Sequence, residues 1–128
     1  MSRGLLLDTH AVLWYLEGNA DRMSVTTRAL IEDPTADVFV SAASFWEIAI
    51  KSGLGKLEAD RDLLSRVAAA GFQALAITAA HAWNVRSLPR HHRDPFDRLL
   101  VAQAQTEGLR LVTRDEVFAS YDGLDVVW

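Results

Sequence analysis

The sequence contains no cysteine, which excludes disulfide bonds and thiolate metal sites and fits the reducing cytoplasm in which we expect the protein to act. No apolar run approaches the roughly 18 residues of a membrane-spanning helix. The run Leu5–Leu7 is too short for a signal peptide, and Asp8 interrupts it. No glycine-rich loop follows a strand-like segment, which argues against P-loop and dinucleotide-binding sites.

The sequence has no excess of basic over acidic residues. The formal net charge is −4, so the chain is not a general nucleic-acid-binding protein. Any contact with a phosphate backbone must therefore depend on a local basic patch or on a bound metal ion. Apolar residues make up 50% of the 128 residues, which argues against disorder and predicts one domain over residues 1–128 with a sizeable core.

Short strand-like runs alternate with longer helical segments along the chain. The predicted strands are residues 4–8, 37–41, 72–77, 109–113 and 124–128. The predicted helices are residues 9–17, 24–33, 42–52, 60–70, 78–87, 94–108 and 115–120. This alternation predicts an α/β fold, with a parallel sheet covered by helices on both faces.

Four acidic residues stand where a predicted strand ends or a helix begins. Asp8 ends the first strand, Glu47 lies just past the second, Asp97 is in the first turn of the long helix 94–108, and Asp115 follows the strand 109–113. The carboxyl ends of parallel strands share one edge of the sheet, and ligands bind there. Carboxylates gathered at one edge repel each other unless a cation neutralises them, and hard divalent cations take such oxygen ligands.

Each of these acids also has a simpler interpretation as a helix cap. Asp8 and Asp115 are suited to N-cap positions. Ser44 and Glu47 match a capping box, although a helix that begins at Ser41 would place Glu47 in its second turn, among apolar neighbours.

The helix 94–108 offers a second acid for the capping role. Asp94 is a natural N-cap and Pro95 suits the first helical position. Asp97 is then free to point from the first turn toward the sheet edge.

The motifs that contain these acids together resemble those of a known family. They are the segments 5–10 (Leu-Leu-Leu-Asp-Thr-His), 40–48 (Val-Ser-Ala-Ala-Ser-Phe-Trp-Glu-Ile), 93–104 and 111–115 (Leu-Val-Thr-Arg-Asp). In this order and spacing they resemble the PIN-domain family, specifically the VapC-like toxins of type II toxin–antitoxin systems. The resemblance covers essentially the whole chain, and the segment 93–104 is its most specific part.

The resemblance implies a three-layer α/β/α sandwich with a central, mostly parallel sheet of four to five strands. It also implies a ribonuclease that depends on Mg²⁺ or Mn²⁺. By position, Asp8, Glu47 and Asp97 correspond to the core acidic set and Asp115 to the fourth position, while Asp94 is an additional acid. The resemblance further implies a homodimer held inactive by an antitoxin protein.

Mg²⁺ retains several waters and binds one or two carboxylates directly. We therefore expect Asp8 and Asp97 nearest the metal, and Glu47 and Asp115 to act through water or on a second ion. The Thr113 hydroxyl is expected to position water.

The RNA must be held by positive charge near this edge. Candidates are Arg93 and Arg98 around the basic run 90–93, and Arg114; a solvated loop is the alternative.

The remaining aromatic and histidine residues are assigned structural roles. Helical apolar patterns predict that Trp46 and Trp83 are packed in the core. Because the proposed chemistry needs no histidine base, His81, His91 and His92 are expected on the surface. His10 is the histidine expected to border the site.

Other functions remain as alternatives. A phosphatase of the haloacid-dehalogenase type would have a second aspartate two residues after Asp8, where this chain has His10. A phospho-acceptor receiver domain would need an acidic pair after the first strand, which is absent. A housekeeping PIN nuclease in RNA processing and a non-catalytic α/β binding module whose acids only cap helices are the other possibilities.

Overall fold

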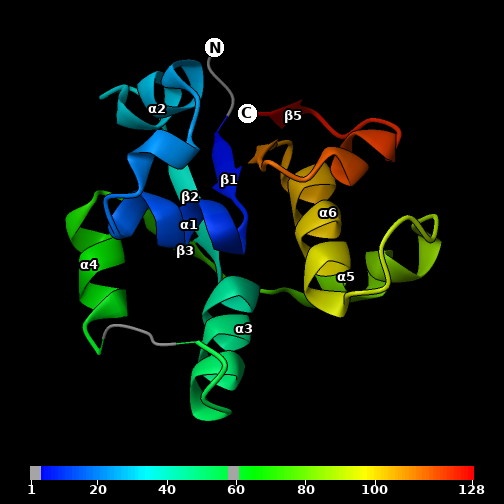
Figure 1. The fold of residues 1–128 in the computed structure, drawn as a ribbon. Coiled ribbons are helices and arrows are strands. Elements are labelled where there is room, and N and C mark those ends of the chain that lie inside the picture. Colours follow the sequence, from blue (N-terminus) through cyan, green and yellow to red (C-terminus); the bar gives the residue numbers. More distant parts are fainter. Residues whose placement is uncertain (1–3, 58–60) are drawn as a thin grey trace.

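Among the residues that the structure describes, five strands form one sheet, and all of them are parallel. The computed structural model describes residues 4–57 and 61–128. The strands are β1 (Leu5–Leu7), β2 (Val38–Ser41), β3 (Gln73–Leu75), β4 (Arg110–Val112) and β5 (Val126–Val127). Their order across the sheet is β3-β2-β1-β4-β5, so β1 lies at the centre (Figure 1). The prediction of a parallel sheet of four to five strands is confirmed.

Six α-helices connect the strands in the described part of the chain. They are α1 (Thr9–Leu16), α2 (Val25–Glu32), α3 (Ala42–Gly53), α4 (Leu63–Ala69), α5 (Ala79–Asn84) and α6 (Pro95–Glu107). Short 3₁₀ helices add η1 (Ala20–Arg22), η2 (Val85–Ser87) and η3 (Glu116–Ser120). No helix in the described part of the chain is both long and apolar enough to traverse a bilayer.

The predicted elements are present, most of them with shorter bounds, whereas α3 extends one residue beyond its predicted end, to Gly53. The helix predicted over 78–87 ends as an α-helix at Asn84 and continues as η2, and η1 was not predicted. The helix predicted from residue 60 begins at Leu63, and residue 60 itself lies outside the described residues. α6 ends at Gly108, whose φ of 68° is the left-handed conformation that glycine adopts at low cost.

Two hydrophobic clusters cover the two faces of the sheet. Leu5 and Leu7 of β1 pack into a cluster with residues from α1, α2 and α4. Leu6 points to the opposite face and packs against α6 and η3. α5 packs against α6 on that second side, so the molecule has three layers (Figure 1). The three-layer α/β/α sandwich is confirmed.

A buried polar network joins α3 to α6. Gln103 of α6 is fully buried, and its Oε1 accepts a hydrogen bond of 2.5 Å from the hydroxyl of Ser41, the N-cap of α3. The Gln103 side-chain amide lies 3.4 Å from the carbonyl of Ala76 and 3.4 Å from Nδ1 of His81. Because α3 carries Glu47 and α6 carries Asp97, this network helps to set the position of one acid relative to the other.

Substitution of Gln103 by leucine should destabilise the fold. The change leaves the buried Ser41 hydroxyl without its acceptor, which costs about 1–3 kcal/mol. Urea unfolding followed by circular dichroism measures the free energy of unfolding. Gln73→Leu, at an exposed position of β3, is the control and should stay within about 0.5 kcal/mol of the wild type. Equal stability of both variants would show that the network contributes nothing.

Candidate active site

The candidate site lies at the carboxyl edge of the three central strands. β1 pairs with β2 on one side and with β4 on the other. The chain therefore leaves β1 at the point where the strand order reverses, which is where open α/β sheets bind ligands. Asp8 follows β1, α3 follows β2, and Thr113 follows β4.

Asp8 is a helix cap and a buried carboxylate at once. Its Oδ1 accepts a hydrogen bond of 2.8 Å from the amide of Ala11, and its side chain is the N-cap of α1. Only 7% of the residue is exposed. Burial raises the pKa of Asp8 above its ordinary value, although hydrogen bonds from Thr113 and Ala11 and the charge of His10 oppose the shift.

Glu47 lies inside α3 and not in a capping box. Ser41 is the N-cap, and its hydroxyl accepts a hydrogen bond from the amide of Ala43. The Thr9 hydroxyl lies 2.6 Å from Oε1 of Glu47 and 3.0 Å from Oγ of Ser44. Since a hydroxyl has one proton, Thr9 donates it to Glu47 and accepts from Ser44. Glu47 is thereby held beside the turn that begins at Asp8.

Asp97 is released from capping by Asp94. The Oδ1 atom of Asp94 accepts hydrogen bonds from the amides of Phe96 and Asp97, at 2.7 and 3.3 Å, and Pro95 occupies the first turn of α6. The prediction that Asp94 caps this helix is confirmed. The side chain of Asp97 is left half-buried at the N-terminus of α6, on the side that faces the other acids.

Asp115 is the most exposed of the set and is held by a histidine. Its Oδ1 accepts from the amide of Val117, and its Oδ2 lies 3.0 Å from Nε2 of His92. Partial burial raises the pKa of Asp115, but the hydrogen bonds with His92 and Val117 outweigh it and leave the pKa below its ordinary value. Thr113 accepts the amide proton of Asp115 at 3.1 Å, so it connects Asp115 with Asp8.

Asp97 interacts electrostatically with three other acids. Burial, and next the negative charge of Asp94, raise the pKa of Asp97 to about 6; His92 opposes this rise, and the charges of Glu47 and Asp8 add smaller contributions to it. Contributions from Glu47 and Asp8 require that residues far apart in the sequence lie near one another. The structure thus places Glu47 and Asp8 within electrostatic range of Asp97, and Asp115 within range of Asp8. Among the described residues, no three acidic or histidine side chains are close enough together to hold a metal ion.

The predicted RNA-binding arginines lie in different surroundings. Arg98 donates to the backbone carbonyls of Val85, Leu88, Pro89 and His92. It therefore ties the loop between α5 and α6 to the start of α6. Arg90 and Arg93 line a cavity of about 620 Å³ with Arg98 and form no ion pair within the described residues. The guanidinium of Arg114 lies over the ring of Trp14, 6.0 Å from its centroid.

Some predictions about histidines and tryptophans are wrong. His81 is fully buried and its Nε2 lies 2.8 Å from Glu107, while the His92 side chain is only 8% exposed. His91 is exposed, as predicted. Trp46 and Trp83 are 58% and 66% exposed, because their helices turn these positions away from the sheet.

Lys51 is the residue of this site that the sequence analysis did not single out. Its Nζ lies 2.8 Å from Oε2 of Glu47, one helical turn earlier on α3. The hydrogen bond with Glu47 raises the pKa of Lys51, and the charges of Asp94 and Asp97 contribute to the same shift. The spacing of four residues between Glu47 and Lys51 on a helix was the available signal.

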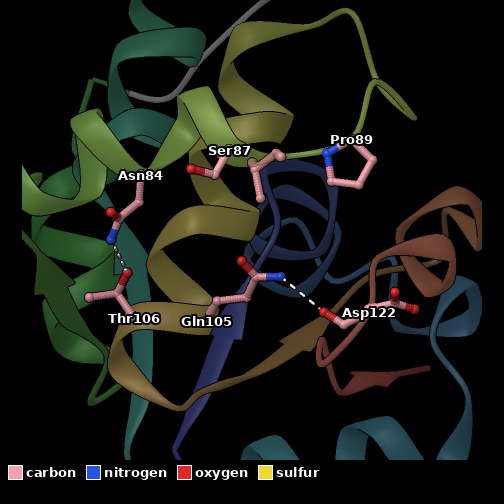
Figure 2. A pocket seen from close by; sticks show the side chains of 7 residues that line it. Asn84, Ser87, Pro89, Gln105, Thr106 and Asp122 are labelled. Atoms are coloured by element: carbon pink, nitrogen blue, oxygen red, sulfur yellow. Dashed lines mark hydrogen bonds between the residues drawn. The ribbon is translucent and has the colours of Figure 1, made fainter.

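A second, polar pocket lies away from these acids (Figure 2). In it, Asn84 donates to Thr106 and the Gln105 amide donates to the backbone carbonyl of Asp122, both at 3.2 Å. Thr106 follows Asp97 by nine residues on α6, about 13 Å along the helix axis. This pocket is therefore separate from the candidate active site.

A comparison with protein families decides the identity of the fold. The PIN domain family matches residues 5–124, which include all four acids of the site. The chain belongs to the PIN domain family. Because the match extends over nearly the whole chain, the PIN domain contains both the sheet and the elements that carry the acids.

Similar proteins include VapC toxins and their complexes. The chain is 30% identical over 120 residues to ribonuclease VapC22 of Mycobacterium tuberculosis strain ATCC 25618 / H37Rv, covering 91% of each protein. It is also similar in structure to VapBC2 from Rickettsia felis bound to a promoter DNA fragment, with a TM-score of 0.71, 15% identity and 96% coverage of each chain. DNA-bound VapBC from Salmonella typhimurium gives a TM-score of 0.70, with 18% identity and 98% coverage of each chain. This PIN domain is thus a homologue of VapC ribonuclease toxins.

Asp97→Asn should stabilise the metal-free protein in a pH-dependent way. The pKa of Asp97 is raised from 3.8 to about 6 in the folded state. The folded state therefore holds this proton more tightly than the unfolded chain, and stability falls as pH rises from about 4 through about 6. In EDTA, Asp97→Asn should melt several degrees above the wild type at pH 7.5, with a much smaller difference at pH 4.5.

Asp115→Asn provides a control with the opposite sign. The pKa of Asp115 is lowered, so its charged form contributes stability that is present above about pH 4 and lost as the pH falls. This variant should melt below the wild type at pH 7.5. A lower melting temperature for Asp97→Asn at pH 7.5 would contradict the repulsion argued for the site.

Proposed function

We propose that this PIN domain is a metal-dependent endoribonuclease and the toxin of a toxin–antitoxin pair. It cleaves RNA phosphodiester bonds at the cluster formed by Asp8, Glu47, Asp97 and Asp115. The observation that carries the proposal is the placement of these carboxylates around the reversal point of the sheet, where burial, and then the charges of nearby acids, disfavour the charged form of Asp97.

The donor atoms suit Mg²⁺ or Mn²⁺. All are carboxylate oxygens, which such hard cations prefer, and a divalent charge would relieve the repulsion around Asp97. Within residues 4–57 and 61–128, no three acidic or histidine side chains are already arranged as a complete metal site. Mg²⁺ needs only one or two direct carboxylates beside its waters, so Asp8 and Asp97 suffice. When bound, the ion lowers the pKa of a water molecule and neutralises charge on the reacting phosphate.

The chain's own residues hold the carboxylates in place. The Ala11 amide and Thr113 fix Asp8, while Thr9 and Lys51 fix Glu47. We assign Glu47 and Asp115 to positions that act through water or on a second ion. One carboxylate oxygen of Asp94 accepts hydrogen bonds from two backbone amides of α6. We therefore assign Asp94 to capping first and to metal binding second. Thr113 lies beside Asp8 and is suited to orienting a water.

The RNA backbone is held by the basic residues beside this edge. Arg93, together with Arg90, supplies positive charge at the cavity that adjoins the start of α6. Arg114 follows β4 near Trp14 and provides a second contact. Arg98 serves the substrate indirectly, because its hydrogen bonds to four carbonyls shape the loop that carries Arg90 and Arg93.

The partners are an antitoxin and a second copy of the chain. The similarity to proteins from VapBC complexes supports an antitoxin partner. We expect this antitoxin to bind near the first helices and to place a basic side chain at the carboxylates. Trp14, Tyr15 and Leu16 on α1 are half-buried and lie directly after the site. An apolar segment in a groove is a recurring mode of recognition, and here it would block RNA and metal together. We place the protein in the cytoplasm, together with its RNA substrate and the antitoxin.

A non-catalytic binding module is the second candidate. The observation in its favour is that Asp8, Asp94 and Asp115 do cap α1, α6 and η3. Capping leaves Glu47 and Asp97 unexplained, because Glu47 lies inside α3 and Asp97 in the first turn of α6 without accepting a capping bond. The nuclease proposal accounts for both residues.

Asp8→Asn and Asp97→Asn should each abolish cleavage of RNA by the purified protein while leaving its circular dichroism spectrum unchanged. Each change removes a negative charge that the metal requires. Gel analysis of RNA incubated with saturating Mg²⁺ measures the activity, and EDTA should eliminate it. Asp122→Asn, which alters an exposed acid in the pocket of Figure 2, is the matched control and should cleave like the wild type. Wild-type cleavage by Asp97→Asn would remove Asp97 from the site.

Expression of this chain alone should slow bacterial growth, because unrestrained RNA cleavage stops translation. Growth curves in a host that has no cognate inhibitor test this, and the Asp8→Asn variant should be harmless. Normal growth with soluble, metal-loaded wild-type protein would count against the toxin and leave a housekeeping PIN nuclease in RNA processing as the better assignment.

A further inference from the structure

Lys51 places an ammonium group against a buried carboxylate of the site. Its Nζ lies 2.8 Å from Oε2 of Glu47; the Lys51 side chain is 45% exposed and that of Glu47 only 9%. The geometry is unlike that of the other ion pair with the same helical spacing, Arg28–Glu32, which is 3.5 Å long and exposed on both sides. A pair of the Arg28–Glu32 kind contributes little, whereas a carboxylate shielded from water depends on its partner.

The positive charge of Lys51 acts on two further acids near Glu47. Besides Glu47, the charges of Asp94 and Asp97 across the α3–α6 junction interact with this ammonium. In the part of the chain that the structure describes, no other lysine or arginine forms an ion pair with an acid of the site. His10 and His92 lie on the Asp8 and Asp115 side. Lys51 is therefore the permanent cation on the Glu47 side.

Both oxygens of Glu47 are already engaged. Oε1 accepts the Thr9 hydroxyl at 2.6 Å, and Oε2 accepts from Lys51. A divalent cation that approaches Glu47, directly or through a water, therefore meets either a hydroxyl donor or an ammonium group. Of the two, the ammonium presents the larger barrier, because like charges repel.

We propose that Lys51 is a built-in counter-cation that neutralises Glu47 in the metal-free protein and competes with the divalent cation for the acidic site. The inference rests on the metal dependence in the proposed function. It assigns Lys51 a charge-balancing role with two opposite consequences. The ammonium offsets the repulsion among the carboxylates and so stabilises the folded protein when no metal is bound. The same charge weakens metal binding.

Titration of purified protein with Mn²⁺ in a calorimeter tests this exchange. Lys51→Met keeps the aliphatic length of the side chain and removes its charge. It should bind Mn²⁺ roughly tenfold more tightly than the wild type, since one repulsive charge near the site is gone. In EDTA its melting temperature should fall by a few degrees, so that the Mn²⁺-induced rise in melting temperature is larger than in the wild type.

Two further variants serve as controls. Lys51→Arg retains the charge and should bind Mn²⁺ within about twofold of the wild type. Arg28→Met removes one positive charge from the exposed ion pair on α2. α2 and α3 lie at opposite ends of the view in Figure 1, so this variant should leave the Mn²⁺ dissociation constant unchanged. Together they separate the position of the Lys51 charge from the net charge of the protein.

If Lys51→Met has the same Mn²⁺ affinity and the same metal-free melting temperature as the wild type, Lys51 is only a member of a surface ion pair. That result would overturn the proposal. Weaker Mn²⁺ binding would also overturn it, because Lys51 would then orient Glu47 for the metal without competing. If the wild type shows no saturable Mn²⁺ binding, both the metal dependence in the proposed function and the Lys51 proposal fail. If the wild type binds Mn²⁺ but Lys51→Met behaves like it, only the Lys51 proposal fails.

Discussion

Repulsion among carboxylates at the carboxyl edge of β1, β2 and β4 is the constraint on which the rest of this structure depends. The strands are buried on both faces, so the acids that follow them gather at one edge with little freedom to separate. Helix N-termini offset part of the repulsion, since Asp8, Asp97 and Asp115 each lie at the start of a helix. Hydrogen bonds from Thr9, Thr113 and Lys51 offset more, and a divalent cation is suited to the remainder.

The local parts of this arrangement could be predicted from the sequence. Ser24, Asp94–Pro95 and Gly108 mark helix ends by their own conformational preferences, so the helices were placed within a few residues. The proximity of Asp8 and Asp115 followed from the geometry of parallel strands, because each residue lies after a strand. Asp97 lies on a helix, so its position relative to Asp8 depends on how α6 packs. The dual role of Asp8 and Asp115, as caps and as acids of one cluster, could not be settled from the sequence, because capping and clustering use the same residue types at the same positions.

The long-range parts could not be predicted. Periodicity shows that a helix has an apolar face but not which neighbour covers it, and Trp46, Ile50 and Leu54 form an uncovered row on α3. The buried positions of His81 and His92 depend on partners 26 and 23 residues away, Glu107 and Asp115, which no local pattern reveals. The contact between Gln103 and Ser41 spans 62 residues and is likewise a product of tertiary packing.

A crystal structure of the protein soaked in Mn²⁺, with data collected at the manganese absorption edge, tests the central claim most directly. The account predicts an anomalous peak between Asp8 and Asp97, within bonding distance of at least one oxygen of each, and Glu47 and Asp115 no more than one water molecule away. A Mn²⁺ ion bound elsewhere on the molecule, with Asp8 and Asp97 still engaged only by protein groups, would contradict it.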